Sequence, residues 1–197
     1  MISIDDIIKI REQVKAKQNK KRYEHTLGVA YTAAALAFMY DMDPLKAELA
    51  GMLHDCAKCM SDDELITECS KNGIHLSKEE LESPQVIHAI YGSVLAREKY
   101  GINDDDIINA VRYHTTGRDN MSLLEKIIFT ADYIEPLRCQ APHLEELRKL
   151  AFTDIDECVY RILSQTVSYL EGLDKQIVPD TLKAYQWYRN ERKNYNE

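Results

Sequence analysis

The chain has 197 residues, a length that favours one domain. Hydrophobic residues make up 45%, which supplies a sizeable core and excludes a disordered chain. The formal net charge of −8 argues against a broad basic face for a nucleic-acid backbone. The 7 glycines and 5 prolines are too few for a β-sandwich, a barrel or a Gly-rich phosphate loop.

Cellular context is indicated by what the sequence lacks. Its start has neither the basic segment nor the long apolar run of a signal peptide. No stretch approaches the roughly 18 uninterrupted apolar residues of a membrane span. Five cysteines, an odd number without framework spacing, are typical of reduced thiols. We therefore expect a cytoplasmic protein.

Helix signals recur along the first half of the chain. Capping boxes, in which a serine and an acidic residue three positions later bond each other's backbone N–H, precede apolar residues at helical spacing at Ser3, Ser61 and Ser77. A further helix is expected from about Arg22 to Met39, and Asp43-Pro44 has the N-cap and first-turn proline of another.

The second half continues in the same way, and strand patterns hardly occur. The predicted helix starts, in chain order, are Ser83-Pro84, Asn103, Ser122, Pro142, Thr153 and Asp180. Gly101 and Pro136 are expected to end two of these helices, and a long helix should span 155–170. The sequence therefore predicts an all-α fold in a single domain over residues 1–197.

Side chains that can bind metals are unevenly placed along these helices. Each lies on a predicted helix or at its end, beside apolar residues, where a polar side chain must find partners. One histidine in such a place is usually a hydrogen-bonded core residue. An ordered set on five helical segments instead predicts a shared metal site. The set is His25, His54, Asp55, His88, His114 and Asp132.

The order His, His-Asp, His, His, Asp resembles the HD-domain superfamily of metal-dependent phosphohydrolases, which have an all-α fold. Within it, the sequence is similar to the YqeK-type proteins, known as symmetrical bis(5′-nucleosyl)-tetraphosphatases and also described as HD hydrolases involved in NAD metabolism. The specific strings are LHDCAK at 53–58, HTTG at 114–117 and ADYIEPLR at 131–138. The resemblance implies a metal-binding core over about 20–140, with C-terminal helices over about 143–195 packed on it.

The same resemblance implies a two-metal site. His25, His54, Asp55 and Asp132 would hold one ion, and His88 and His114 a second, with Asp55 bridging. A mixed set of nitrogen and oxygen ligands with open positions suits iron or manganese better than calcium or a closed zinc site. Two such ions would activate a water and clamp a phosphoryl group, so no protein nucleophile is required.

Other residues are candidates for substrate contacts. Lys58 follows His54 by four residues and Asp55 by three, so on a helix all three would face one cleft, and we expect Lys58 to act in catalysis with Asp55. Thr115 and Arg138 are further candidates for binding phosphate. Less specific candidates are Arg22 and Glu24, which could orient metal ligands. Tyr91 and Tyr133 could stack on a nucleobase.

The resulting hypothesis is a hydrolase that cleaves diadenosine tetraphosphate into two ADP with two divalent transition-metal ions, iron or manganese. The alternative is an HD-type nucleotidase or deoxynucleoside triphosphatase that acts on mononucleotides. A non-catalytic nucleotide sensor is disfavoured, because all six ligand positions are filled. A di-iron oxygenase is disfavoured, because Lys58 and Arg138 would then have no anionic substrate to bind. We expect a nucleotide as partner, not a nucleic acid or a membrane, and leave a homodimer open.

Overall fold

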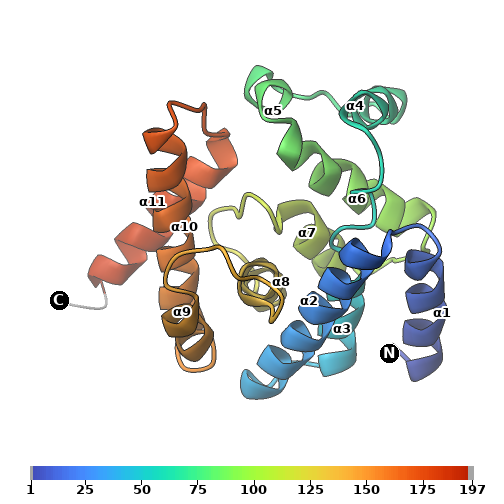
Figure 1. Cartoon of the computed structure of the whole chain (residues 1–197), viewed down its shortest axis with the longest axis horizontal. Helices are drawn as coiled ribbons and strands as arrows, with labels where there is room; N and C mark the ends of the chain where they lie inside the picture. Colours follow the sequence, from blue (N-terminus) through green and yellow to red (C-terminus); the bar gives the residue numbers. More distant parts are fainter. Residues whose placement is uncertain (1, 195–197) are drawn as a thin grey trace.

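The computed structural model of the chain describes the backbone of residues 2–194 and the side chains of residues 2–192. Over the described residues the chain forms eleven α-helices, one 3-10 helix (η1) and no strand, which confirms the predicted all-α fold. In chain order (Figure 1) they are α1 Ile4–Lys15, α2 Lys20–Met39, α3 Pro44–Leu53, α4 Asp62–Lys71, α5 Lys78–Glu82, η1 Pro84–Val86, α6 Ile87–Glu98, α7 Asp105–Tyr113, α8 Leu123–Ile134, α9 Leu144–Leu150, α10 Ile155–Gly172 and α11 Pro179–Asn194.

The helix starts that depend on capping boxes are confirmed. At Ser3, Ser61, Ser77 and Ser122 the serine side chain accepts a hydrogen bond from the third backbone N–H of its helix, and the acidic residue there bonds back to the serine N–H. These contacts span three residues, so sequence alone is enough to place them. Asp43 caps α3 as expected, with Pro44 in the first turn.

Several other predicted starts are wrong by one or two residues. Asp104, not Asn103, caps α7, since its carboxylate accepts from the N–H of Asp106 at 3.0 Å. Asp154, not Thr153, caps α10 through the N–H of Glu157. In each pair the aspartate is one position nearer the first helical turn, where a carboxylate can reach the free N–H groups.

The remaining starts also differ in detail. α2 begins at Lys20 behind an Asn19 cap rather than at Arg22. Pro84 opens the short helix η1, and α6 begins only at Ile87. α9 begins at Leu144 instead of Pro142, and α11 at Pro179 instead of Asp180. The shifted starts of α9 and α11 leave the order of the helices unchanged.

Small residues bring α2 and α3 together. Ala30 on α2 and Gly51 on α3 are fully or nearly fully buried, and a Cβ on Gly51 would lie 2.7 Å from the Cα of Ala30. Any side chain larger than hydrogen at residue 51 would therefore push the two helices apart. This close approach places the second turn of α2, which carries His25, against the end of α3, which carries His54.

The remaining helices surround this pair. α8 packs against α2, α3, α7 and α10, so it lies between the N-terminal helices and the α10–α11 pair on the left of Figure 1. One continuous hydrophobic core joins both parts, because it contains Leu36 of α2, Leu124 of α8 and Ile162 of α10. No helix among residues 2–194 is both long and apolar enough to cross a bilayer.

Candidate metal centre and its cleft

Six side chains converge where five helices meet. His25 lies on α2, His54 is the C-cap of α3, His88 lies on α6 and His114 is the C-cap of α7. Asp132 projects from α8, and Asp55 follows His54 directly. The six residues predicted from sequence are therefore brought together. His54, Asp55, His88 and His114 are buried, at 0 to 4% exposure.

Asp55 lies at the centre of this cluster and faces two groups of histidines. Its Oδ2 lies 3.4 Å from His54 Nε2 and 3.8 Å from His25 Nε2, while its Oδ1 lies 3.0 Å from His88 Nε2 and 3.8 Å from His114 Nε2. Asp132 joins the first group, with Oδ1 at 3.1 Å from His25 Nε2. The cluster thus consists of two sets of potential ligands that share one carboxylate.

Hydrogen bonds on the far side of three rings orient the histidines. Nδ1 of His25 donates to Glu135 Oε1 at 3.1 Å, Nδ1 of His54 to the carbonyl of Gly51 at 2.6 Å, and Nδ1 of His114 to the carbonyl of Val111 at 2.8 Å. Because these acceptors require a proton on Nδ1, the Nε2 lone pairs remain available toward Asp55.

The donor set and its spacing fit divalent metal ions. Ligand atoms held at right angles about 2.1 Å from an ion lie about 3 Å apart, close to the 3.0–3.8 Å spacings seen here. Asp55 and His114 favour the deprotonated forms that a metal requires, whereas burial lowers the pKa of His54 but the charges of Asp55 and Asp132 outweigh it and raise that pKa. Burial raises the pKa of Asp55, but the adjoining His54 and His88 outweigh it and hold that pKa well below its usual range. Burial, with the charges of His54 and His88, lowers the pKa of His114 to about 3.

Three cations surround the cluster. Arg22 Nη1 donates to Asp55 Oδ2 at 2.6 Å, and Arg138 Nη2 donates to Asp132 Oδ1 at 3.1 Å. The Nε of Arg138 is buried without a hydrogen-bond partner. Lys58 Nζ lies 3.0 Å from His88 Nδ1. These cations offset the negative charge of Asp55 and Asp132 within the site.

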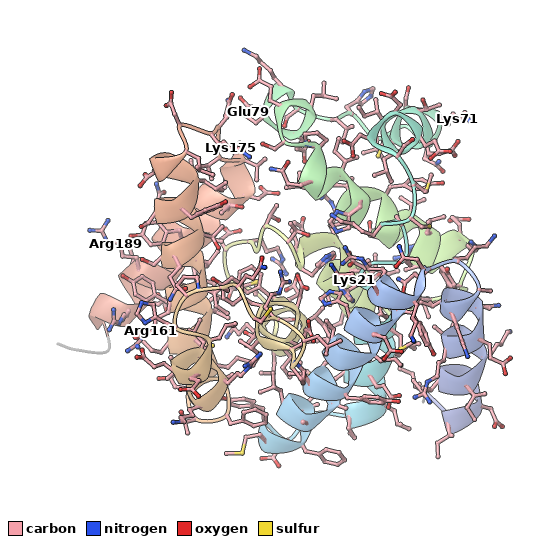
Figure 2. The ribbon with its side chains drawn as sticks, in the orientation of Figure 1. Lys21, Lys71, Glu79, Arg161, Lys175 and Arg189 are labelled. Atoms are coloured by element: carbon pink, nitrogen blue, oxygen red, sulfur yellow. The ribbon has the colours of Figure 1, made fainter. Side chains whose placement is uncertain are left out.

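A cleft of about 900 Å³ lies beside this cluster, and His25 is the cluster residue in its lining. Lys21, Arg22 and His25 of α2 line one side, where Figure 2 labels Lys21 near the start of that helix. Thr115 and Arg138 also line it, and further residues of η1, the loop after α8, α10 and α11 contribute to the walls. Its volume lies at the upper end of the 300–1,000 Å³ found for small-molecule sites.

Comparisons with known proteins agree with this geometry. Residues 22–137 match the model of the HD domain, and this segment contains all six residues of the cluster. The chain belongs to the HD domain family.

Relatives within this family extend along almost the whole chain. It is 42% identical to the symmetrical bis(5′-nucleosyl)-tetraphosphatase of Halalkalibacterium halodurans, over 94% of this chain and 98% of that protein. The protein of the same name from Bacillus subtilis is 40% identical, over 88% and 92%. A crystal structure from Clostridium acetobutylicum, described as a predicted HD superfamily hydrolase involved in NAD metabolism, has a TM-score of 0.90 and 38% identity, over 97% of this chain and 99% of that one.

Several residues proposed from the sequence to contact the substrate or to orient ligands lie elsewhere in the structure. Residues 54–59 form turns after α3 and not a helix, so the helical spacing assumed for Lys58 is wrong. Lys58 contacts the outer side of His88 and is not among the residues that line the cleft. Tyr91 lies away from the cleft, with its hydroxyl on Glu68, and Glu24 is exposed. Thr115 does line the cleft, with its hydroxyl 3.1 Å from His114 Nε2.

Glu135 is the functional candidate that sequence reasoning missed. It is 2% exposed, and its Oε2 accepts a hydrogen bond from the N–H of Leu137 at 2.6 Å. Arg148 holds the surrounding loop by donating to the carbonyls of Ile134, Glu135 and Arg138. An acidic residue followed by proline at a helix end was a visible signal, but its partner, His25, is 110 residues away.

Proposed function

We propose that this protein is a metal-dependent phosphohydrolase that cleaves dinucleoside polyphosphates symmetrically, converting diadenosine tetraphosphate and water into two ADP. The observation that carries the proposal is Asp55, whose two oxygens face two histidine groups beside a cleft large enough for more than a mononucleotide. The names of the relatives from H. halodurans and B. subtilis support the choice of substrate.

The proposed cofactor is a pair of divalent transition-metal ions, iron or manganese. His25, His54, Asp55 and Asp132 would hold one, and His88 and His114 the other, with Asp55 shared between them. Four imidazole nitrogens and two carboxylates are a ligand set that suits these metals. When bound, such a pair would lower the pKa of a water and stabilise charge on a phosphoryl group.

The surrounding side chains have distinct proposed roles. Arg22 and Lys21 line the cleft from α2, and Arg138 lines it from the loop after α8, so an anionic polyphosphate meets positive charge along that side. The unpartnered Nε of Arg138 is free to donate to a phosphate oxygen. Thr115 supplies a hydroxyl at the same side, while Lys58 acts through His88.

The products follow from where the chain of phosphates is cut. Water adds to a phosphorus atom beside the central bridging oxygen, and the bond between that phosphorus and that oxygen breaks. One ADP departs with the bridging oxygen, and the other carries the oxygen of water on its terminal phosphate. The departing ADP gains negative charge, which cations at the cleft can stabilise.

Hydrolysis in oxygen-18 water tests this assignment directly. The expected products are two ADP, of which one carries a single label on its terminal phosphate. ATP and AMP as the main products would overturn symmetrical cleavage. Rapid phosphate release from mononucleotides, without turnover of any dinucleoside tetraphosphate, would identify a nucleotidase instead. We place the activity in the cytoplasm, which the five free thiols support.

A further inference from the structure

The residues that line the cleft divide by charge. Its cations come from α2 and the loop after α8, namely Lys21, Arg22 and Arg138. The residues contributed by α10, the loop after it and α11 are all uncharged, although 29% of the chain is charged. The part of the cleft with these cations therefore suits a polyphosphate, and the part lined by α10 suits a neutral group.

The α10 wall is one face of that helix. Gln165, Thr166, Tyr169 and Leu170 follow the spacing of i, i+1, i+4 and i+5, which puts them side by side. The stretch 162–170 contains no charged residue. Figure 2 shows Arg161 in the lower half of α10 and Lys175 beyond its upper end, so the charges flank the wall and do not interrupt it.

One hydrogen bond prepares this wall for a polar, flat ligand. Tyr133 Oη on α8 donates to Gln165 Oε1 on α10 at 3.2 Å. With that bond in place, the Gln165 amide keeps its NH₂ group as a donor for a ligand in the cleft. The ring nitrogens of nucleobases are acceptors, and amide side chains are common partners of adenine.

The aromatic side chains at the wall point to the same class of ligand. Tyr133 is half-buried and lines the cleft. Tyr169 is 67% exposed and belongs to the cleft lining, so its ring is accessible to a ligand in the cleft. Tyrosine rings stack on bases, and such stacking is sequence-tolerant and worth about 1–3 kcal/mol per base.

We infer that the wall formed by Tyr133, Gln165 and Tyr169 is a nucleobase subsite. A nucleotide would lie with its phosphates toward Arg22 and Arg138 and its base against α10. The choice of ligand rests on the proposed function, whereas the assignment of these three residues rests on the cleft itself. The cleft combines a charged part with a neutral part, as a nucleotide combines phosphates with a base.

Equilibrium binding of two probes tests the subsite. ADP carries a base, and inorganic pyrophosphate carries the same two phosphates without one. We expect Gln165→Ala to weaken ADP binding about tenfold by calorimetry and to leave pyrophosphate binding unchanged. Tyr133→Phe keeps the ring but loses the bond to Gln165, so a smaller loss, again limited to ADP, is expected. Gln186→Ala, at an exposed position on α11, is the matched control.

The outcomes separate the subsite from the proposed function. Equal weakening of both probes, or undiminished ADP binding by Gln165→Ala, would overturn the subsite, as would a wild-type protein that prefers pyrophosphate to ADP. A base-selective effect in a protein that hydrolyses only mononucleotides would support the subsite and overturn symmetrical cleavage. Circular dichroism of each variant checks that the helices are intact.

Discussion

Glu135 holds His25 from the side opposite the other ligand side chains: its Oε1 lies 3.1 Å from Nδ1 of the ring. The carboxylate is buried, and Gly28, one turn after His25, leaves room for it. A Cβ at residue 28 would lie 2.6 Å from Glu135 Oε2. A carboxylate in this position fixes the ring and raises the basicity of its other nitrogen.

Substitution of Glu135 should therefore weaken metal binding. We expect Glu135→Ala to reduce metal affinity by about 10–100-fold, and Glu135→Gln to have a smaller effect, since its amide oxygen can still accept from His25. Titration with Mn²⁺ measures both. Glu24→Ala, an exposed glutamate beside His25 in the chain, serves as the control. Unchanged affinity in Glu135→Ala would reduce this residue to a structural role.

The number of bound ions distinguishes a shared carboxylate from two separate sites. Protein purified without chelator should bind close to two ions per chain. Asp55→Ala should lose both, because each of its oxygens faces one histidine group, whereas His88→Ala should mainly lose one. Elemental analysis measures the ratio. A single ion at saturation, or equal losses in the two variants, would contradict the arrangement.

Lys58 should affect turnover more than metal content. Its Nζ contacts His88 Nδ1 at 3.0 Å, outside the ligand cluster, and burial lowers the pKa of its ammonium group. We expect Lys58→Ala to retain both ions and to lose on the order of 10–100-fold in kcat. Lys71→Ala, at an exposed lysine that pairs with Glu68, is the control. Equal kcat values for the two variants would show that Lys58 has no role in turnover.

A bound nucleotide should shield one particular thiol. Cys139 is exposed and lines the cleft beside Arg138, whereas the exposed Cys59 lines a different pocket. We expect saturating ADP to slow alkylation of Cys139 severalfold and to leave Cys59 unaffected, as followed by peptide mass spectrometry. Protection of both thiols, or of neither, would place the nucleotide outside this cleft.

An ion pair between α3 and α7 gives a pH-dependent prediction. Lys46 Nζ lies 2.8 Å from Asp104 Oδ2. Burial raises the pKa of Asp104, but hydrogen bonds from Lys46 and the α7 backbone bring it below its ordinary value of 3.8. A lowered pKa contributes stability above that ordinary value, and this contribution disappears as the pH falls through the folded-state pKa.

The Asp104→Asn variant isolates this charge, because asparagine still caps α7. With the carboxylate 41% exposed, the loss at pH 7 should be below about 1 kcal/mol of unfolding free energy. Urea unfolding should show the difference from wild type shrinking as the pH falls below 3.8. A difference that stays constant with pH would mean that the ion pair does not contribute.

Local sequence was sufficient to predict the helices and to name the six side chains of the ligand cluster. Capping boxes at Ser61 and Ser77 formed where they were expected, because their partners lie three residues away. The six metal-capable residues could be chosen because buried polar side chains on several helices need common partners. Where two possible cap residues stood next to each other, as with Asn103 and Asp104, the prediction chose the wrong one.

Tertiary packing decided how these side chains meet. The packing of α7 against α3, and of α6 against α7, divides the oxygens of Asp55 between two histidine groups. The approach of α8 to α2 brings Glu135 to His25. The turn at 54–59 likewise moved Lys58 behind His88. Helix signals act over three or four residues, whereas these contacts join positions 30 to 110 residues apart. The geometry of the contacts therefore depends on how the helices pack, which small residues such as Gly51 allow.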